Sequence, residues 1–399
     1  MSHRSCDVFI AGAGPAGLAA AIALRQRGAD VLLVDALRPP IDKPCGEGLM
    51  PEVRRALTNL GIQLEPHHGT EFTGITFASG QATVSANFPG GTGIGVRRTT
   101  LHRLLLERAT ELGVRFSWNT PVVLRENQPP TLAGEPIHYQ WLIGADGAAS
   151  RVRAWAGLEA AQLRSRRFGF RAHYRIAPWS SHVEVHWGPL GQTYITPTGP
   201  EEICVSAMTR HPGVRLAEIL NSIPVLRDKL PNAVPTSSER GCLTLTRRLR
   251  RVTRNNIALI GNVALLGDAS GSVDAITGEG LALAFRQALL LAQSLEGSNL
   301  AHYESNHAAT LALPQRMASL LLLLDRHPSL RNRTLRAFAD RPALFRELLA
   351  VHIGHQTLPH FLLRQGPNLA ARLLAPQPPF DPCFVRESGP TNPPCTDRI

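Results

Sequence analysis

The chain has 399 residues, a length that corresponds to two or three domains at roughly 150 residues each. It carries a formal net charge of +11, and 43% of its residues are hydrophobic, which excludes general disorder. No segment approaches the ~20 uninterrupted apolar residues of a membrane-spanning helix. The six cysteines form no CxxC pair, which argues against a zinc ribbon or a dense disulfide framework. We expect a globular, cytoplasmic protein.

The first 37 residues combine two short apolar runs, 8–11 and 31–34, with a glycine-rich turn and a helical stretch between them. This order predicts a parallel strand–helix–strand unit. Residues 72–88 alternate in polarity around a Ser-Gly turn, which predicts an antiparallel hairpin. A helix follows at 99–112, where leucines recur at helical spacing.

Further along, residues 167–210 alternate strongly and predict a mostly antiparallel sheet. Buried-strand patterns return at 257–266, and a long apolar helix is expected at 281–295. Residues 310–375 read as basic helices. The proline-rich segment 376–399 predicts a disordered tail.

The first glycine-rich turn has the spacing GxGxxG between a predicted strand and a predicted helix. Gly12 permits a tight turn, Gly14 lets a pyrophosphate approach the backbone, and Gly17 allows close packing of helix and strand. Asp35 ends the second strand and can accept hydrogen bonds from ribose hydroxyls. Together these features predict dinucleotide binding. A second glycine cluster at 91–95 lacks the final glycine and is interpreted as a loop.

Two later motifs separate FAD from NAD(P). The segment 144–147 reads GADG and is followed by Ser150 and Arg151, and 267–270 reads GDAS and is followed by GEG at 278–280. In this order they resemble the flavoprotein hydroxylase superfamily typified by p-hydroxybenzoate hydroxylase, over residues 1–300. The WxWxIP motif of flavin-dependent halogenases is absent from the sequence, so halogenation is not expected.

The resemblance implies that Asp268 binds the ribityl chain of FAD and that the helix after Gly280 points its N-terminus at the flavin ring. It also implies that Asp146 and Gly147 support FAD and NAD(P)H use, and that Arg98 takes the place of the superfamily's arginine. The predicted cofactor-binding residues are therefore Gly12, Gly14, Pro15, Ala16, Gly17, Asp35, Arg98, Asp146, Gly147, Gly267, Asp268, Gly278 and Gly280.

The sequence departs from the hydroxylase pattern at Gly271 and Ala275, where hydroxylases usually carry a His-like residue and a Pro. Instead, the segment 43–48, KPCGEG, together with GEG at 278–280 resembles the geranylgeranyl reductase branch. This likeness would place Cys45 at the active site as a candidate catalytic residue. The alternative is a structural cysteine in a glycine-rich turn.

The expected fold is an α/β protein with a Rossmann-like FAD-binding domain, an inserted antiparallel-sheet substrate domain and a C-terminal helical extension. The predicted boundaries are 1–71, 96–156 and 250–300 for the FAD domain, 72–95 and 157–249 for the substrate domain, and 301–375 for the extension.

The predicted function is an FAD-dependent oxidoreductase that uses NADPH or NADH, with a monooxygenase acting on an apolar, aromatic or polyketide-type substrate placed first. The alternatives are a reductase of carbon–carbon double bonds and a non-enzymatic flavin-binding protein. Neither a metal site nor nucleic-acid binding is expected, because His182, Glu184 and His186 lack a further well-placed ligand and no aromatic-basic module is present. The basic helices are a solvated surface or a docking site for anionic membrane. The oligomeric state is left open.

Overall fold

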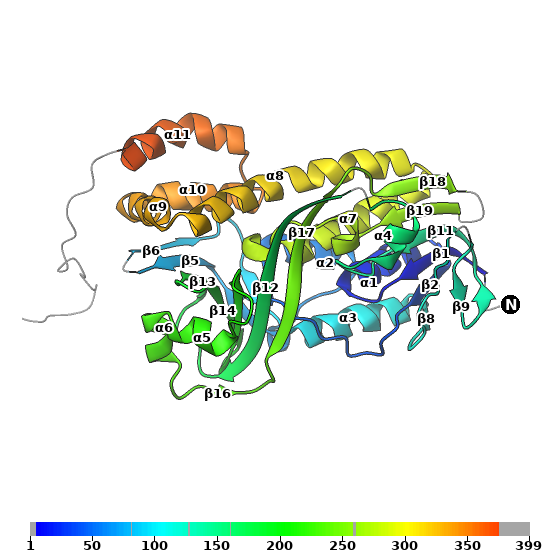
Figure 1. The fold of residues 1–399 in the computed structure, drawn as a ribbon, viewed down its shortest axis with the longest axis horizontal. Coiled ribbons are helices and arrows are strands. Elements are labelled where there is room, and N and C mark those ends of the chain that lie inside the picture. The colour runs from blue at the N-terminus through cyan, green and yellow to red at the C-terminus, as the bar shows by residue number, and fades with distance from the viewer. Residues whose placement is uncertain (1–4, 81, 127, 160, 258–260, 375–399) are drawn as a thin grey trace, which may run out of the picture.

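The computed structural model describes residues 5–80, 82–126, 128–159, 161–257 and 261–374. One end of the molecule is built on a six-stranded sheet with the order β18-β19-β11-β1-β2-β8 (Figure 1). Its strands are parallel except for β18, which runs antiparallel to β19. Their bounds are Ser5–Ala11 (β1), Val31–Val34 (β2), Arg115–Ser117 (β8), His138–Gly144 (β11), Thr253–Ile257 (β18) and Gly261–Leu265 (β19).

Helices cover this sheet because its strands are apolar on both faces. The alanine-rich α1 packs against α3 and α7, and α7 also contacts α2 and α8. Alanines at the contact let the helix backbones approach closely, and nearly all of α1 is buried. The helices are α1 (Pro15–Arg25), α2 (Pro51–Asn59), α3 (Arg98–Glu111), α4 (Arg151–Trp155), α7 (Gly280–Glu296) and α8 (Leu300–Arg326).

The second large sheet has eight strands, seven of them in the order β16-β12-β15-β14-β13-β5-β6, with β17 also paired to β12. All pairs are antiparallel except β13 with β5. The bounds are Gly74–Ser79 (β5), Ala82–Asn87 (β6), Ala161–Arg175 (β12), His182–Trp187 (β13), Gln192–Gly199 (β14), Glu202–Thr209 (β15), Val234–Pro235 (β16) and Arg240–Leu249 (β17).

Each end of this second sheet is covered by different helices. The short helices α5 (Leu216–Asn221) and α6 (Pro224–Lys229) enclose one apolar cluster with β12, β14 and β15. The C-terminal helices α9 (Pro328–Asp340) and α10 (Pro342–His352) pack on β5 and β6 and bury a second cluster, and α11 (Leu358–Leu374) packs on them (Figure 1). None of the described helices has the length and apolar character that crossing a bilayer requires.

The interpretation of residues 91–95 as a loop holds for Gly91 and Thr92 but is wrong for the last three residues. Gly93–Gly95 forms β7, the middle strand of a three-stranded sheet with β3 (Gly48–Leu49) and β4 (Thr70–Phe72). A methyl group on Gly95 would lie 1.8 Å from the carbonyl oxygen of Pro197, so only glycine lets this strand lie against β14. Gly93 and Gly95 therefore serve close strand packing, whereas Gly91, with φ +77°, lies in the loop before the strand.

The smaller elements are the strand pair β9 (Thr131–Leu132) and β10 (Glu135–Pro136) and the 3-10 turns η1 (Pro66–His68), η2 (Gly267–Ser270) and η3 (Ala275–Thr277). The predicted parallel unit, hairpin, antiparallel sheet and long helix are all confirmed. The predicted domain boundaries stay a prediction, and the predicted tail at 376–399 lies outside the described residues.

Candidate flavin-binding and active site

The glycine turn between β1 and α1 shows why its spacing matters. Gly12 has φ +110°, and a methyl group there would lie 2.5 Å from the carbonyl oxygen of Ala145. A methyl group on Gly17 would lie 1.9 Å from the Gly12 carbonyl oxygen, so this position also requires glycine. A methyl group on Gly14, by contrast, would have no atom within 4 Å of it. The backbone is therefore open at Gly14, just before Pro15 begins α1.

Asp35 is joined to this turn. Its Oδ2 accepts a 2.7 Å hydrogen bond from the backbone N–H of Ala13, and its Oδ1 accepts a 2.8 Å bond from that of Leu37. Each carboxylate oxygen retains acceptor capacity after one such bond. The half-buried side chain can thus hold the loop and still accept bonds from ribose hydroxyls.

Asp146 has a clear structural role. Its Oδ2 accepts hydrogen bonds of 2.7 and 3.1 Å from the backbone N–H groups of Arg151 and Val152 at the start of α4, and its Oδ1 accepts one from the Ser150 hydroxyl. A carboxylate at a helix N-terminus satisfies N–H groups that have no partner within the helix. Contact of Asp146 or Gly147 with NAD(P)H stays a prediction.

The two aspartate-containing motifs are joined by Arg153, a buried residue of α4. Its Nη2 donates to the carbonyl oxygen of Ala148, directly after Gly147, and its Nη1 donates at 3.1 Å to that of Ala269, directly after Asp268. On the other side, a methyl group at Gly267 would lie 2.8 Å from the Ala16 side chain. The turns that carry all three motifs therefore meet at one place.

The turn that carries Asp268 is braced from two helices. Gln287 of α7 accepts a 2.9 Å hydrogen bond from the backbone N–H of Gly267, and His307 of α8 lies 2.9 Å from the Ser270 hydroxyl. Burial lowers the pKa of His307 to about 4, which keeps its imidazole neutral.

Asp268 itself is accessible to solvent, yet the protein around it raises the pKa of its carboxyl group by desolvation, while Lys43 and Arg98 lower it. Among the described residues, no side chain or backbone group donates a hydrogen bond to this carboxylate. A solvent-accessible acceptor of this kind fits a polar chain such as the ribityl of FAD.

Arg98, the first residue of α3, has a side-chain donor that could bind the same cofactor as the Asp268 acceptor. Its backbone N–H donates a 2.9 Å hydrogen bond to Oε1 of Glu47, but its Nε is buried without a hydrogen-bond partner among the described residues. A buried guanidinium N–H without a partner is costly unless a ligand satisfies it. The free N–H therefore fits an anionic cofactor such as FAD.

The start of α7 faces open space as well. Gly278 adopts φ +70°, which turns the chain into the helix, and a methyl group on Gly280 would have no atom within 4 Å of it. The 17 residues of α7 give a helix dipole whose positive end lies here. The openings at Gly14 and Gly280, the free carboxylate of Asp268 and the free N–H of Arg98 together fit FAD.

Cys45 lies between these groups and the eight-stranded sheet, which belongs to the predicted substrate domain and is called the substrate sheet below. The backbone N–H of Glu47 donates a 3.4 Å hydrogen bond to the half-buried Cys45 sulfur. The thiol of Cys204 in β15 donates a 3.7 Å hydrogen bond to the Cys45 carbonyl oxygen. Desolvation raises the pKa of the Cys45 thiol, Arg98 lowers it, and Glu47 raises it further. The net effect keeps this sulfur protonated.

Sequence reasoning missed Glu47, which connects three parts of the site. Its φ of +59° is rare for a non-glycine residue. Its Oε2 lies 2.6 Å from Nε2 of His173. Since Arg171 can only donate, the Nδ1 of His173 accepts at 3.1 Å and the proton resides on Nε2. The signal in the sequence that could have pointed to it is an acidic residue between two glycines in the segment KPCGEG.

Glu47, His173 and Cys204 have ligand atoms within 4.8 Å of one another, a spacing that a metal ion could bridge. The guanidinium of Arg171, 3.9 Å from Glu47, already supplies positive charge there. The other candidate set, His182, Glu184 and His186, does not form one cluster. His186 is hydrogen-bonded to Glu184 at 2.8 Å, whereas His182 is hydrogen-bonded to Thr76 and Asn87. The geometry at both places is that of hydrogen-bonded clusters.

The chain belongs to the FAD binding domain family, whose model matches residues 5–211. The fold, the site and this match define an FAD-dependent oxidoreductase of the flavoprotein hydroxylase superfamily, and a merely flavin-binding protein is thereby disfavoured.

Among curated relatives, a menaquinone reductase of Mycobacterium tuberculosis is 28% identical over 74% of this chain and 78% of its own length. A digeranylgeranylglycerophospholipid reductase of Methanosarcina acetivorans is 27% identical over 69% of this chain and 71% of its own length. Among solved structures, a flavoprotein/dehydrogenase from Cytophaga hutchinsonii has a TM-score of 0.74 at 17% identity and covers 91% of this chain and 96% of its own. A flavin-dependent brominase, Bmp2 triple mutant, has a TM-score of 0.74 at 16% identity, covering 92% and 100%. The structural likenesses concern the fold alone.

Proposed function

We propose that the protein is an FAD-dependent, NAD(P)H-using reductase that saturates a carbon–carbon double bond in an apolar, isoprenoid-type substrate. The observation that carries the proposal is the protonated thiol of Cys45, which lies between the Arg98 end of the cofactor site and the substrate sheet. The names of the menaquinone and digeranylgeranylglycerophospholipid reductases, which match more than two thirds of the chain, support the same class of reaction. This places the reductase ahead of the monooxygenase.

Reducing an isolated double bond requires one hydride and one proton. FAD held at this site and reduced by a nicotinamide cofactor would supply the hydride. The remaining carbon needs a proton from a group that is protonated at neutral pH, and Cys45 Sγ holds one because burial raises the pKa of its thiol. The S–H bond breaks as the new C–H bond forms, and solvent returns a proton to the half-buried sulfur.

The neighbouring residues position this thiol. The Glu47 backbone donates to Cys45 Sγ, and the Glu47 carboxylate is held by His173 and by the Arg98 backbone. The rigid segment would keep Sγ at a constant place relative to the cofactor. A general acid acts only when it is held within hydrogen-bond reach of the atom that it protonates.

A monooxygenase is the second candidate, favoured by one observation. A 2-heptyl-3-hydroxy-4(1H)-quinolone synthase of Pseudomonas aeruginosa is 27% identical over 72% of this chain. In a monooxygenase reaction the reduced protein would react with O2 first, before any reaction with the substrate.

The test separates these reactions by the fate of the reducing equivalents. The FAD-loaded protein is reduced anaerobically with NADPH or NADH and then mixed with menaquinone or geranylgeraniol. The reductase predicts flavin reoxidation without oxygen and a product heavier by two hydrogen atoms. Reoxidation only with O2, through a transient absorbing at roughly 370–400 nm, and a product that gains oxygen would establish the monooxygenase instead.

A further inference from the structure

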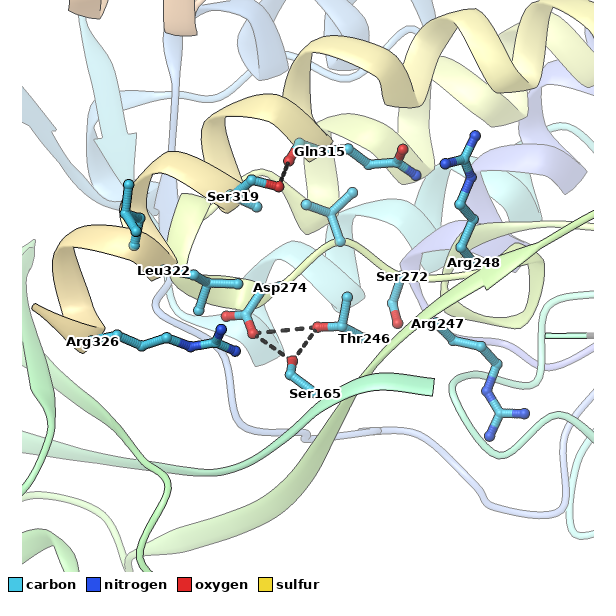
Figure 2. A pocket seen from close by; sticks show the side chains of 13 residues that line it. Ser165, Thr246, Arg247, Arg248, Ser272, Asp274, Gln315, Ser319, Leu322 and Arg326 are labelled. Atoms are coloured by element: carbon cyan, nitrogen blue, oxygen red, sulfur yellow. Dashed lines mark hydrogen bonds between the residues drawn. The ribbon is translucent and has the colours of Figure 1, made fainter. Parts of the chain in front are cut away.

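A cavity of about 290 Å³ opens between α8, β17 and the loop that follows the Asp268 turn (Figure 2). Its volume is close to the lower limit, about 300 Å³, of ligand-binding pockets. Ligand pockets of this kind combine an apolar wall with a few polar groups. The cavity therefore has the size to hold part of a chain-like ligand.

One wall of the cavity is apolar. Val273 of the loop and Ala318, Leu322 and Leu323 of α8 line it. Leu323 is 44% exposed, and its neighbour Leu320 is 36% exposed, so apolar surface continues from the cavity onto the outer face of α8. Large exposed apolar side chains beside a cavity mark a binding surface more often than scattered single ones.

The single carboxylate in the lining, Asp274, is neutralised from within the protein. Its Oδ1 lies 3.1 Å from Nη1 of the buried Arg167, and its Oδ2 accepts hydrogen bonds from Ser165 and Thr246, as Figure 2 shows for the last two. Its negative charge is thus already balanced. Asp274 contributes little repulsion toward an anionic ligand.

Two exposed arginines stand at the cavity with their charge available. Arg326 extends from α8 and Arg248 from β17, on opposite sides of the opening (Figure 2). In the part of the chain that the structure describes, neither has an acidic side chain within ion-pair distance. A third lining arginine, Arg247, is paired with Glu159 at 3.1 Å. The mouth therefore presents two positive charges without a partner.

The cavity is connected to the cofactor site by backbone hydrogen bonds. The N–H of Ser272 donates at 2.9 Å to the Arg247 carbonyl oxygen, and the N–H of Arg247 donates back at 3.2 Å. Ser272 follows Asp268 by four residues. A ligand in the cavity would thus rest against the same loop that continues into the flavin-binding turn.

From this combination we propose that the cavity binds a single apolar chain that ends in a carboxylate or phosphate, with the chain against Leu322 and the anionic end at one of the two unpaired arginines, Arg248 or Arg326. That this amphiphile is also the substrate rests on the proposed function. Binding itself does not, because it can be measured without turnover. The anionic end can come from a free amphiphile or from a lipid headgroup.

The first experiment titrates the FAD-loaded protein with decanoate and with 1-decanol by calorimetry, below the concentration at which decanoate forms micelles. Decanoate should bind, and decanol should bind about tenfold more weakly because an unpaired arginine stabilises an anion. Leu322→Trp should abolish decanoate binding by filling the cavity. Arg248→Gln combined with Arg326→Gln should weaken decanoate about tenfold and leave decanol unchanged.

Two matched variants guard against misfolding effects. Leu320→Trp and Arg316→Gln alter exposed residues of α8 that do not line the cavity, and they should leave decanoate binding unchanged. Sedimentation with phosphatidylglycerol vesicles, compared with phosphatidylcholine vesicles, shows whether the anionic end belongs to a lipid headgroup or to a free amphiphile. Capture on phosphatidylglycerol that Leu322→Trp removes indicates a lipid headgroup, whereas decanoate binding without capture indicates a free amphiphile.

The proposal is overturned if Leu322→Trp and the arginine pair variant bind decanoate and phosphatidylglycerol vesicles as the unmodified protein does. It is also overturned if decanol binds as tightly as decanoate. A protein that binds decanoate as expected but fails to reduce any double bond would retain this site and lose only the proposed reaction.

Discussion

Oε2 of Glu47 and Nε2 of His173 lie 2.6 Å apart although 126 residues separate them in the chain. Both side chains are almost entirely buried, at 1–2% side-chain exposure. The pair joins the segment that carries Cys45 to β12 of the substrate sheet. It thereby couples the position of the candidate acid to the sheet on which a substrate would lie.

Glu47→Gln should lower the free energy of unfolding by about 2 kcal/mol, because the buried carboxylate that it removes accepts hydrogen bonds from His173 and from the Arg98 backbone, and hydrogen bonds to a charged group contribute about 1.5–3 kcal/mol. Guanidinium titration of the purified protein measures this. The matched control is Glu71→Gln, whose pair with Arg54 is largely exposed and should change stability by less than about 1 kcal/mol. Equal effects of the two substitutions would mean that the Glu47 pair has no special structural role.

Asp268→Ala should lose FAD during purification, because no side chain or backbone group of the described residues donates a hydrogen bond to its carboxylate and a ligand is its expected partner. The ratio of flavin to protein absorbance after gel filtration measures the loss. Asp228→Ala, at an exposed site on α6, should retain full flavin content. An Asp268→Ala protein that remains fully flavinated would refute the assignment of this residue.

Cys45→Ser should retain FAD but lower the rate of substrate reduction at least about a hundredfold, the lower range for loss of a general acid. The serine hydroxyl has nearly the same shape and is a far weaker acid. Cys6→Ala, in β1, removes a thiol remote from Arg98 and should leave the rate unchanged. Normal turnover of the Cys45→Ser protein would return Cys45 to the structural class.

His307 predicts a loss of stability in acid. Burial lowers its pKa to about 4, against about 6.5 in the unfolded chain, so the unfolded state binds more protons between these values. Stability should therefore fall as pH decreases through this window, by about 3 kcal/mol in total from this group. Unfolding at about pH 7 and about pH 4.5 should show that His307→Gln removes much of the decrease.

The exposed His360 provides the comparison for that measurement. His360→Gln should leave the pH dependence as it is, because this side chain is in contact with solvent in the folded protein as well as in the unfolded chain. If His307→Gln retained the full dependence, another buried group would have to be responsible, and the neutral state of His307 would not brace the Asp268 turn.

Local backbone requirements explain why part of the site could be predicted. Gly12 and Gly17 are required where any side chain would strike neighbouring backbone, and this requirement is written in the spacing of the glycines. The Asp268 turn and the GEG start of α7 have the same local character. Alternation likewise predicted the substrate sheet, because side chains of a strand point to opposite faces.

The sequence pattern could not assign those faces. Arg167, Arg171 and His173 alternate with apolar residues along β12, yet all three are buried. Arg167 is compensated by Asp274, and Arg171 by Asp42, from distant segments. A buried charge is stable only with such a partner, and partners brought together by folding leave no periodic signal.

The sequence by itself therefore determined the cofactor class and the fold, because a dinucleotide is held by backbone turns whose glycines and aspartates are contiguous. Only the tertiary structure decided how Cys45 is held, since Glu47, Arg98 and His173 meet through long-range packing. It also decided that 93–95 is a strand and that α8 and β17 enclose a cavity. Contacts between segments far apart in the chain depend on the packing of whole sheets and helices, which no local pattern specifies.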